Sequence, residues 1–302
     1  MSQGSINYAS NYVPIPTPVP TPSPTLFPTP PSSGKVVAMW FQDISGPTLA
    51  ANAATLKAHG VTHVLWTLGT WREGETPNYE YWQSGFAQGI TALHNQGIKA
   101  IALIMNTWPG APADVNVDNS AYNTARINSA VSIVQQYGFD GFADVLEQWS
   151  GSEANFISYN NQLNIAMHNI GKEFFFVNMC WEGMGWSISN VYGNIVADYV
   201  VPEFYGDPDC TLEWFTPFFH TLMVSSKSPI VVGTTVQALP DGCRYTLAEE
   251  FAWIEDELNS YPNERSKYAG ISVFGGTHQG QPNPFFMSAT DWAMLDAYLA
   301  TW

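Results

Sequence analysis

Positive charge is scarce in this sequence of 302 residues. It has 10 Lys and Arg against 26 Asp and Glu, which gives a formal net charge of −16. A field of that sign repels phosphate backbones and anionic lipid surfaces, so neither a nucleic acid nor a membrane is an expected partner. No apolar run reaches the ~18 residues that a membrane-spanning helix needs. Neutral or cationic molecules remain as partners.

Motifs for metal, cofactor and nucleophilic-serine chemistry are also lacking. The three cysteines, Cys180, Cys210 and Cys243, do not have the spacing of a zinc or redox site. No Gly-x-Ser-x-Gly, His-Glu-x-x-His or phosphate-binding glycine motif occurs, and the six histidines do not cluster. We therefore expect no metal and no cofactor.

Aromatic residues, by contrast, are abundant. Phe, Trp and Tyr make up 14% of the chain and include 12 Trp, while hydrophobic residues in total reach 45%. That content is enough for a large core and excludes global disorder. It also provides more Trp than a core usually needs, so part of the aromatic set is expected to line a binding surface.

Residues 1–34 differ in composition from the rest of the chain. Prolines alternate with Thr, Ser and apolar residues between Pro14 and Pro31. Alternating proline fixes φ and removes backbone donors, so this segment is predicted to be an extended polyproline II linker or tail. Pro-Thr spacers resemble those of secreted polysaccharide-degrading enzymes, which favours a secreted protein although the first residues form no signal peptide. A generic low-complexity tail is the alternative.

From Lys35 onward, short apolar runs alternate with helical stretches. The runs are rich in Val, Ile, Phe or Tyr, as buried parallel strands are. They span residues 36–41, 63–68, 100–105, 141–146, 174–179, 199–204, 230–234 and 270–274. Helices are predicted between them, several ending at a glycine, over residues 47–59, 79–96, 119–137, 155–170, 190–196, 212–224, 246–261 and 289–301.

Eight strand–helix units within residues 35–302 predict a single (β/α)8 barrel. An open doubly wound sheet is the alternative, and eight units without a phosphate-binding fingerprint fit it less well. Cys210 and Cys243 follow neighbouring predicted strands, so a disulfide between them is a possibility that the sequence leaves open.

The functional residues of such a barrel lie at the C-terminal ends of its strands. Here nearly every predicted strand ends with an aromatic residue and with an amide or a carboxylate. Aromatic rings stack on sugar rings and amides hydrogen-bond to hydroxyls, so the pattern is typical of a carbohydrate cleft, although a single Trp can simply plug a barrel. The expected substrate-binding residues are Trp40, Trp66, Asn106, Trp108, Trp149, Asn178, Trp181, Gln237, Phe274 and His278.

Two glutamates are the candidates for catalysis. Glu147 has the same parity as Ala143 and Val145, so it faces the pocket if those small residues face the barrel interior. An acid among apolar walls keeps its proton more readily, as a general acid must. Glu203 follows an apolar run and is the expected second carboxylate, with Tyr205 on the same side as an assisting group. The reserve carboxylates are Asp144, Glu182 and Asp241.

The run from Asp140 to Glu147 resembles the strand motif of glycoside hydrolase family 18, the chitinase family. In that motif, Asp-Gly-apolar-Asp-apolar-Asp-x-Glu, the final Glu is the acid, and Asp140, Gly141, Phe142 and Glu147 match it. Ala143 and Val145 replace the two inner aspartates, the second of which orients the acetamido nucleophile in the family. Tyr205-Gly206-Asp207 resembles the family's Tyr-Asp pair, and Phe274 stands where the family has a Trp.

The sequence therefore predicts a secreted, monomeric glycoside hydrolase that cleaves a neutral, β-linked polysaccharide of the glucan or chitin type. The sugar, the linkage and the stereochemical outcome stay open. A carbohydrate-binding barrel without activity is one alternative, favoured by the missing aspartates. A structural cell-surface protein whose Pro-Thr segment is the functional part is the other.

Overall fold

A computed structural model describes residues 34–42, 44–71, 85–105, 115–146, 149–179, 186–204, 212–236, 245–275 and 287–302. These residues belong to one compact unit that spans Ser33–Trp302. Except for Gly34, the predicted Pro/Thr-rich segment 1–34 lies outside the described residues.

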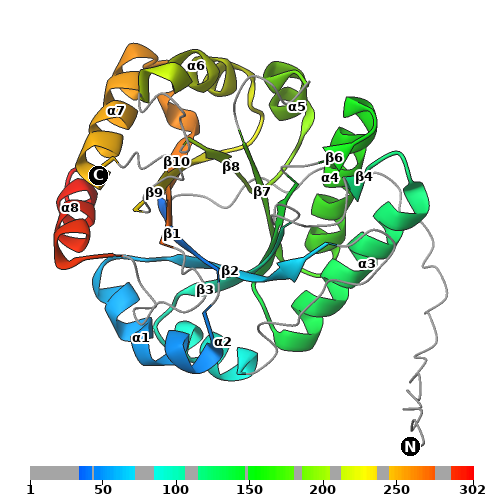
Figure 1. The fold of residues 1–302 in the computed structure, drawn as a ribbon, viewed down its shortest axis with the longest axis horizontal. Coiled ribbons are helices and arrows are strands. Elements are labelled where there is room, and N and C mark those ends of the chain that lie inside the picture. The colour runs from blue at the N-terminus through cyan, green and yellow to red at the C-terminus, as the bar shows by residue number, and fades with distance from the viewer. Residues whose placement is uncertain are drawn as a thin grey trace, which may run out of the picture. The chain divides into compact units, whose positions relative to one another are not determined.

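Eight parallel strands close into a barrel, as predicted (Figure 1). The order around the barrel is β1-β10-β9-β8-β7-β5-β3-β2, so each strand pairs with its sequence neighbours in the barrel. The strands are β1 Val36–Phe41, β2 His63–Thr70, β3 Lys99–Met105, β5 Gly141–Val145, β7 Glu173–Met179, β8 Tyr199–Glu203, β9 Ile230–Thr235 and β10 Tyr268–Phe274.

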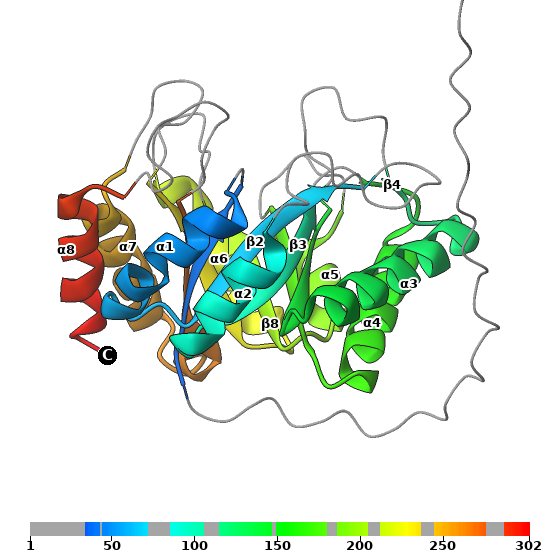
Figure 2. The same cartoon turned by 90° about the horizontal axis from the view of Figure 1, so that it is seen from below.

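The helices form a ring around the barrel (Figures 1 and 2). They are α1 Gly46–Ala58, α2 Phe86–Asn95, α3 Ser120–Tyr137, α4 Glu153–Asn169, α5 Ile188–Asn194, α6 Thr216–Ser225, α7 Leu247–Ser260 and α8 Ala289–Leu299. Several begin at a side chain that accepts a backbone N–H, and α7 and α8 begin with full capping boxes at Thr246 and Ser288. At the other end of α3, Gly138 adopts a left-handed conformation with φ 79°.

Alternation along each strand divides the buried side chains into two layers. Ala143 and Val145 of β5 belong to the layer that fills the barrel interior. Phe142 and Leu146 belong to the layer between the strands and the helices. Because both layers are largely apolar, the strands read as continuous hydrophobic runs in the sequence.

Two features of the strands were not predicted. A second, two-stranded parallel sheet pairs β4, Val115–Asn116, with β6, Trp149–Ser150. It joins the segments that follow β3 and β5. The other feature is at Gly270 of β10, where the register with β9 shifts and φ is 145°. A Cβ there would lie 1.9 Å from the Val36 carbonyl oxygen, so this position requires glycine.

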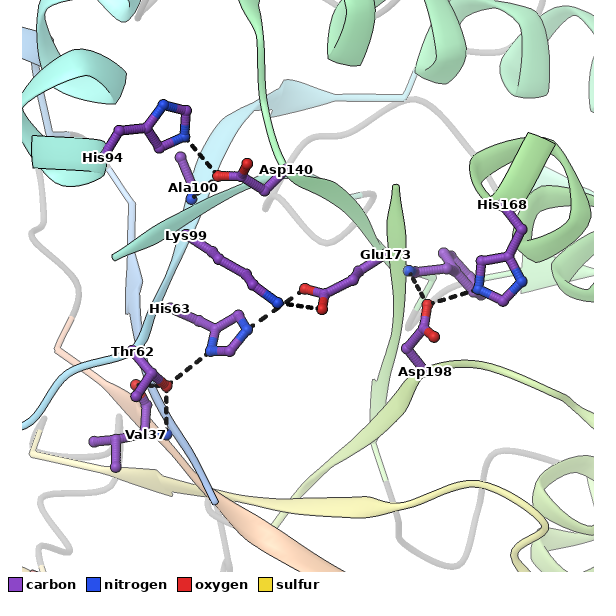
Figure 3. A network of polar contacts seen from close by, with 11 residues as sticks. Val37, Thr62, His63, His94, Lys99, Ala100, Asp140, His168, Glu173 and Asp198 are labelled. Atoms are coloured by element: carbon purple, nitrogen blue, oxygen red, sulfur yellow. Dashed lines mark hydrogen bonds and ion pairs between the residues drawn. The ribbon is translucent and has the colours of Figure 1, made fainter. Parts of the chain in front are cut away.

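The N-terminal end of the barrel carries a network of histidine–carboxylate pairs (Figure 3). His94 of α2 bonds Asp140 at 2.7 Å, and the same carboxylate accepts the Ala100 N–H at the start of β3. Asp198 repeats this arrangement, since it bonds His168 of α4 at 2.9 Å and accepts the N–H of Phe174, near the start of β7, at 2.8 Å.

A third carboxylate of this network, Glu173 of β7, lies at the N-terminal mouth of the barrel. It forms ion pairs with His63, at 3.5 Å, and with Lys99. Burial alone would raise the pKa of Glu173, but hydrogen bonding and charge from His63 and Lys99 hold it below its usual value. Thr62 fixes the far side of the His63 ring, with 2.8 Å between the hydroxyl oxygen and Nδ1.

Candidate active site at the C-terminal end of the barrel

The predicted site residues divide into those that the structure describes and those that lie outside the described residues. The second group contains Asn106, Trp108, Glu147, Trp181, Glu182, Tyr205, Gln237, Asp241 and His278. The three cysteines, including the possible pair Cys210 and Cys243, also lie outside. For these residues the sequence-based roles stay predictions.

Trp40 and Phe274 lie together in the barrel interior, as neighbours on β1 and β10. Their ring centroids are 4.8 Å apart with the planes tilted by 56°. The Trp40 indole N–H donates to the Thr67 hydroxyl of β2 at 2.8 Å, which fixes the orientation of the ring. On the next strand along, Met105 Sδ accepts from the Gln42 side chain at 3.5 Å. Aromatic and polar side chains at the ends of β10 and β1 to β3 therefore contact one another in the barrel interior.

Glu203 is the last residue of β8 and is 3% exposed. It alternates with Tyr199 and Val201, both of which belong to the interior layer, so its side chain also points into the barrel. Its partner in the register with β9 is Gly233, where a Cβ would lie 2.7 Å from the Pro202 carbonyl oxygen. The glycine thus allows β8 and β9 to approach closely beside Glu203.

Ala143 and Val145 fill the interior at the end of β5, both with no exposed surface. Glu147 lies two residues beyond Val145 in the sequence and itself falls outside the described residues. The expected role of Glu147 requires Ala143 and Val145 to face the barrel interior, and both residues do so. It also means that the two inner aspartates of the family motif have no counterpart on this interior face.

Trp66 does not belong to the interior, contrary to its predicted role. It lies on the outer face of β2, fully buried between the strand and α2. Its indole N–H donates to the Ile44 carbonyl at 3.0 Å, and its ring meets Phe86 edge-on. A Cβ at Gly89 would lie 2.8 Å from this ring, so α2 packs directly on it. Trp66 is a core residue of the strand–helix layer.

Asn178 and Trp149 also lie away from the interior surface. Asn178 is fully buried on β7 and alternates with Val177, which is interior, so it takes an outward position. Trp149 belongs to β6 and stacks on Phe156 of α4 at 4.2 Å with an interplanar angle of 8°. One face of Trp149 is therefore covered by α4, while the residue as a whole stays partly exposed.

Asp144, a reserve carboxylate in the sequence-based prediction, faces outward from β5 and not into the barrel. It is fully buried, and its Oδ1 accepts the Trp71 indole N–H at 2.7 Å. Burial raises the pKa of Asp144 to about 6, against the opposing effects of Trp71, the nearby Tyr159 hydroxyl and the Arg126 charge. An acid in this position does not contact a ligand in the barrel interior.

Glu250 of α7 was missed by the sequence-based prediction. It is 1% exposed, and its two carboxylate oxygens lie 3.3 and 3.2 Å from the Thr235 backbone nitrogen at the end of β9. Burial raises the pKa of Glu250 well above its usual value, although the hydrogen bond from Thr235 lowers it. The position was detectable because Glu250 falls between Leu247 and Ile254 in the apolar stripe of α7.

Neither a metal centre nor a membrane span emerges from the part of the chain that the structure describes. No group of three or more His, Cys, Asp or Glu residues is arranged there to hold a metal ion. No helix there is long and apolar enough to cross a bilayer.

Comparisons with known proteins show which folds resemble this one. No family model and no curated protein matches the chain. Among solved structures, a chitinase from Chromobacterium violaceum ATCC 12472 is 14% identical, with a TM-score of 0.66 over 88% of this chain and 99% of that one. The catalytic domain of a family GH18 chitinase from the fern Peteris ryukyuensis is 17% identical, with a TM-score of 0.63 over 88% and 98%.

A more distant solved structure is the spore cortex-lytic enzyme SleL of Bacillus megaterium QM B1551. It is 10% identical, with a TM-score of 0.59 over 89% of this chain and 75% of that chain. At such identities, the likeness establishes the fold, a (β/α)8 barrel of the kind found in chitinases. The residues of the site have to carry the functional conclusion.

Proposed function

We propose that this chain is a glycoside hydrolase that cleaves a neutral, β-linked polysaccharide of the chitin or glucan type. Glu147 is the general acid and Glu203 the second carboxylate, as nucleophile or base. The observation that carries the proposal is the interior position of the buried Glu203 at the C-terminal end of β8. This is the end of the barrel where enzymes of this fold place their active sites.

The surroundings of Glu203 favour a functional role over a structural one. A carboxylate in an apolar interior has a high desolvation cost. Glu173 of β7 also enters the interior, but at the N-terminal end, where it forms ion pairs with Lys99 and His63. On the same side of the barrel, beyond β9, the strands β10 and β1 supply the aromatic pair Phe274 and Trp40. An acid and aromatic rings in one barrel interior match the needs of sugar-ring chemistry.

Trp40 and Phe274 are the proposed stacking surface for a sugar, with Thr67 as the group that orients Trp40. We further propose Tyr205 as the residue that hydrogen-bonds to the reacting sugar or to the second acid. The outer parts of the cleft would come from residues outside the described ranges and from the partly exposed ring of Trp149. Those residues are Asn106, Trp108, Trp181, Gln237 and His278.

The departure from the family motif determines the proposed mechanism. With Ala143 and Val145 in the interior, no aspartate on that face can orient an acetamido group. A second carboxylate is therefore required, and its distance from Glu147 decides the outcome. A separation of about 5–5.5 Å gives a retaining nucleophile, and about 6.5–9.5 Å gives an inverting base.

A carbohydrate-binding barrel without hydrolytic activity is the second candidate. The same observation favours it, because Ala143 and Val145 stand where the family has functional aspartates. For either function we propose a secreted monomer, on the basis of the Pro-Thr segment that precedes the barrel and the chitinase-like fold.

The test is turnover of chito-oligosaccharides, soluble β-glucans and mannans by the parent, Glu147→Gln and Glu203→Gln. We expect an active parent and a loss of about 10²–10⁴ in rate for each variant, since neither amide can transfer the required proton or attack the sugar. Asp256→Asn, at an exposed position of α7, is the control and should keep the parental rate. A parent that binds these sugars but cleaves none supports the binding protein. An active parent with an unaffected Glu203→Gln rules out the proposed second carboxylate.

A further inference from the structure

A buried polar cluster lies on the outer face of β5, opposite the barrel interior. It consists of Asp144 of β5, Trp71 after β2, Arg126 of α3 and Tyr159 of α4. Their exposed fractions are 0%, 1%, 2% and 0%. The Arg126 guanidinium lies 5.8 Å from the centre of the Tyr159 ring and donates to Asn123 at 3.0 Å. The proposed hydrolytic function uses none of these four side chains.

Asp144 is an acidic residue on a face of β5 that is otherwise apolar. Its outward-facing neighbours on β5, Phe142 and Leu146, are apolar and pack in the strand–helix layer. A buried carboxyl group costs free energy there, and a leucine would pack without that cost. Packing alone therefore does not explain why this position has an acidic side chain.

The hydrogen bond from Trp71 to Asp144 connects three strands. Trp71 follows β2, and its backbone N–H donates to the Met105 carbonyl at the end of β3, at 2.9 Å. Its indole then crosses β3, which lies between β2 and β5 in the barrel, and reaches Asp144 at 2.7 Å. The length is at the short end for an N–H···O bond. One residue, through its backbone and its side chain, thus connects the C-terminal ends of β2, β3 and β5.

We infer that Asp144 is a positioning residue, which holds the end of β5 against Trp71 so that the residues after Val145 are set for the reaction. This inference rests on the proposed function, because Glu147 lies two residues beyond that strand end in the sequence. Asp144 itself faces away from the interior and does not touch the substrate. Charged and titratable neighbours of Asp144 are Arg126 from α3 and Tyr159 from α4.

The test compares Asp144→Asn, Asp144→Leu and Trp71→Phe with the parent, at a temperature where each is folded. Asn keeps an oxygen that can accept the indole N–H, so Asp144→Asn should stay within about 3-fold of the parental kcat. Asp144→Leu and Trp71→Phe should each lose about 10–100-fold in kcat with little change in KM, as loss of a supporting residue does. The double variant Trp71→Phe/Asp144→Leu should lose no more than either alone, because both break one contact.

Asp198→Asn is the matched control, since it alters a buried carboxylate at the opposite end of the barrel. Its kcat should be parental while it is folded. The inference is wrong if Asp144→Leu keeps the parental kcat, or if the losses of Trp71→Phe and Asp144→Leu multiply in the double variant.

Amide hydrogen exchange separates this inference from the proposed function. If the parent cleaves none of the sugars, the proposed hydrolysis fails, but exchange at Val145 and Leu146 still reports on the contact. It should become at least about 10-fold faster in Asp144→Leu and in Trp71→Phe and stay unchanged in Asp198→Asn. Unchanged exchange in Asp144→Leu would overturn the positioning role.

Discussion

The two ends of the barrel use acidic side chains in different ways. At the N-terminal end, Asp140, Asp198 and Glu173 are each paired with a histidine, and the two aspartates also accept a strand N–H. At the C-terminal end, Asp144 is paired with an indole N–H and Glu250 with a backbone N–H. The acids at the N-terminal end bind basic side chains, and the acids at the C-terminal end accept hydrogen bonds from neutral N–H groups.

The repeated N-terminal arrangement indicates a structural role. Two units have the same three parts: a histidine in the last turn of a helix, an N–H of the strand that follows this helix, and an aspartate just before the adjacent strand. One unit contains His94 and the other His168. Each unit joins a helix end to two adjacent strands. We therefore expect changes at this end to alter stability and changes at the other end to alter activity.

The largest expected loss of stability comes from breaking one of the N-terminal units. Asp198→Ala removes the acceptor for the buried Phe174 N–H and leaves His168 without its partner. We expect the free energy of unfolding to fall by roughly 3–5 kcal/mol, measured by urea denaturation. Asp256→Asn on the exposed side of α7 should change it by less than about 0.5 kcal/mol. A loss below about 1 kcal/mol for Asp198→Ala would contradict a structural role for this unit.

A smaller and pH-dependent effect is expected at Asp144. Because the pKa of this buried group is raised to about 6 from 3.8, its protonated form is favoured in the folded state. Its contribution to stability is therefore present below about pH 4 and is lost as the pH rises through about 6. Asp144→Asn does not titrate, so its stability relative to the parent should rise by roughly 2–3 kcal/mol between pH 4 and pH 7. A difference that is independent of pH would contradict the burial of an ionisable acid here.

The smallest effect in this series is expected at His168. The hydrogen bond to Asp198 raises the pKa of His168, against partial desolvation. The protonated ring is thus favoured in the folded state, and its stabilising effect is complete below about pH 6 and lost as the pH rises through the raised pKa. His168→Gln should cost about 1 kcal/mol at pH 5 and less at pH 9, by urea denaturation. A larger cost at pH 9 than at pH 5 would reverse this assignment.

The sequence was sufficient to predict the barrel because its strands are buried on both faces. Each strand appears as an apolar run, and the predicted bounds of β1 agree with the structure, while those of the other strands differ by one or two residues. For the same reason, the sequence could not show which side chains point inward and which point outward. With both faces apolar, nothing in the run 63–68 distinguishes an inward Trp66 from the outward one that the structure has.

The site was predictable only where polar residues broke the apolar pattern. Glu203 stood out because an acid ends an otherwise apolar strand, and it alternates with the interior residues Tyr199 and Val201. Glu250 also interrupts an apolar stripe, that of α7, but it was overlooked because acids are common on helices. The two-residue strands β4 and β6 carry too few residues for any period to show. Pairing across segments that are far apart in the chain decides such elements.

The most direct test of this division of roles compares the two interior glutamates, Glu203→Gln at one end and Glu173→Gln at the other. Both are single Glu-to-Gln changes in strand residues that enter the barrel, so kcat and Tm can be compared one to one. The account predicts that Glu203→Gln lowers kcat by about 10² or more while Tm stays within about 2 °C. It predicts that Glu173→Gln keeps the parental kcat while Tm falls by roughly 4 °C or more. A Glu203→Gln variant that loses Tm and keeps kcat would contradict the account.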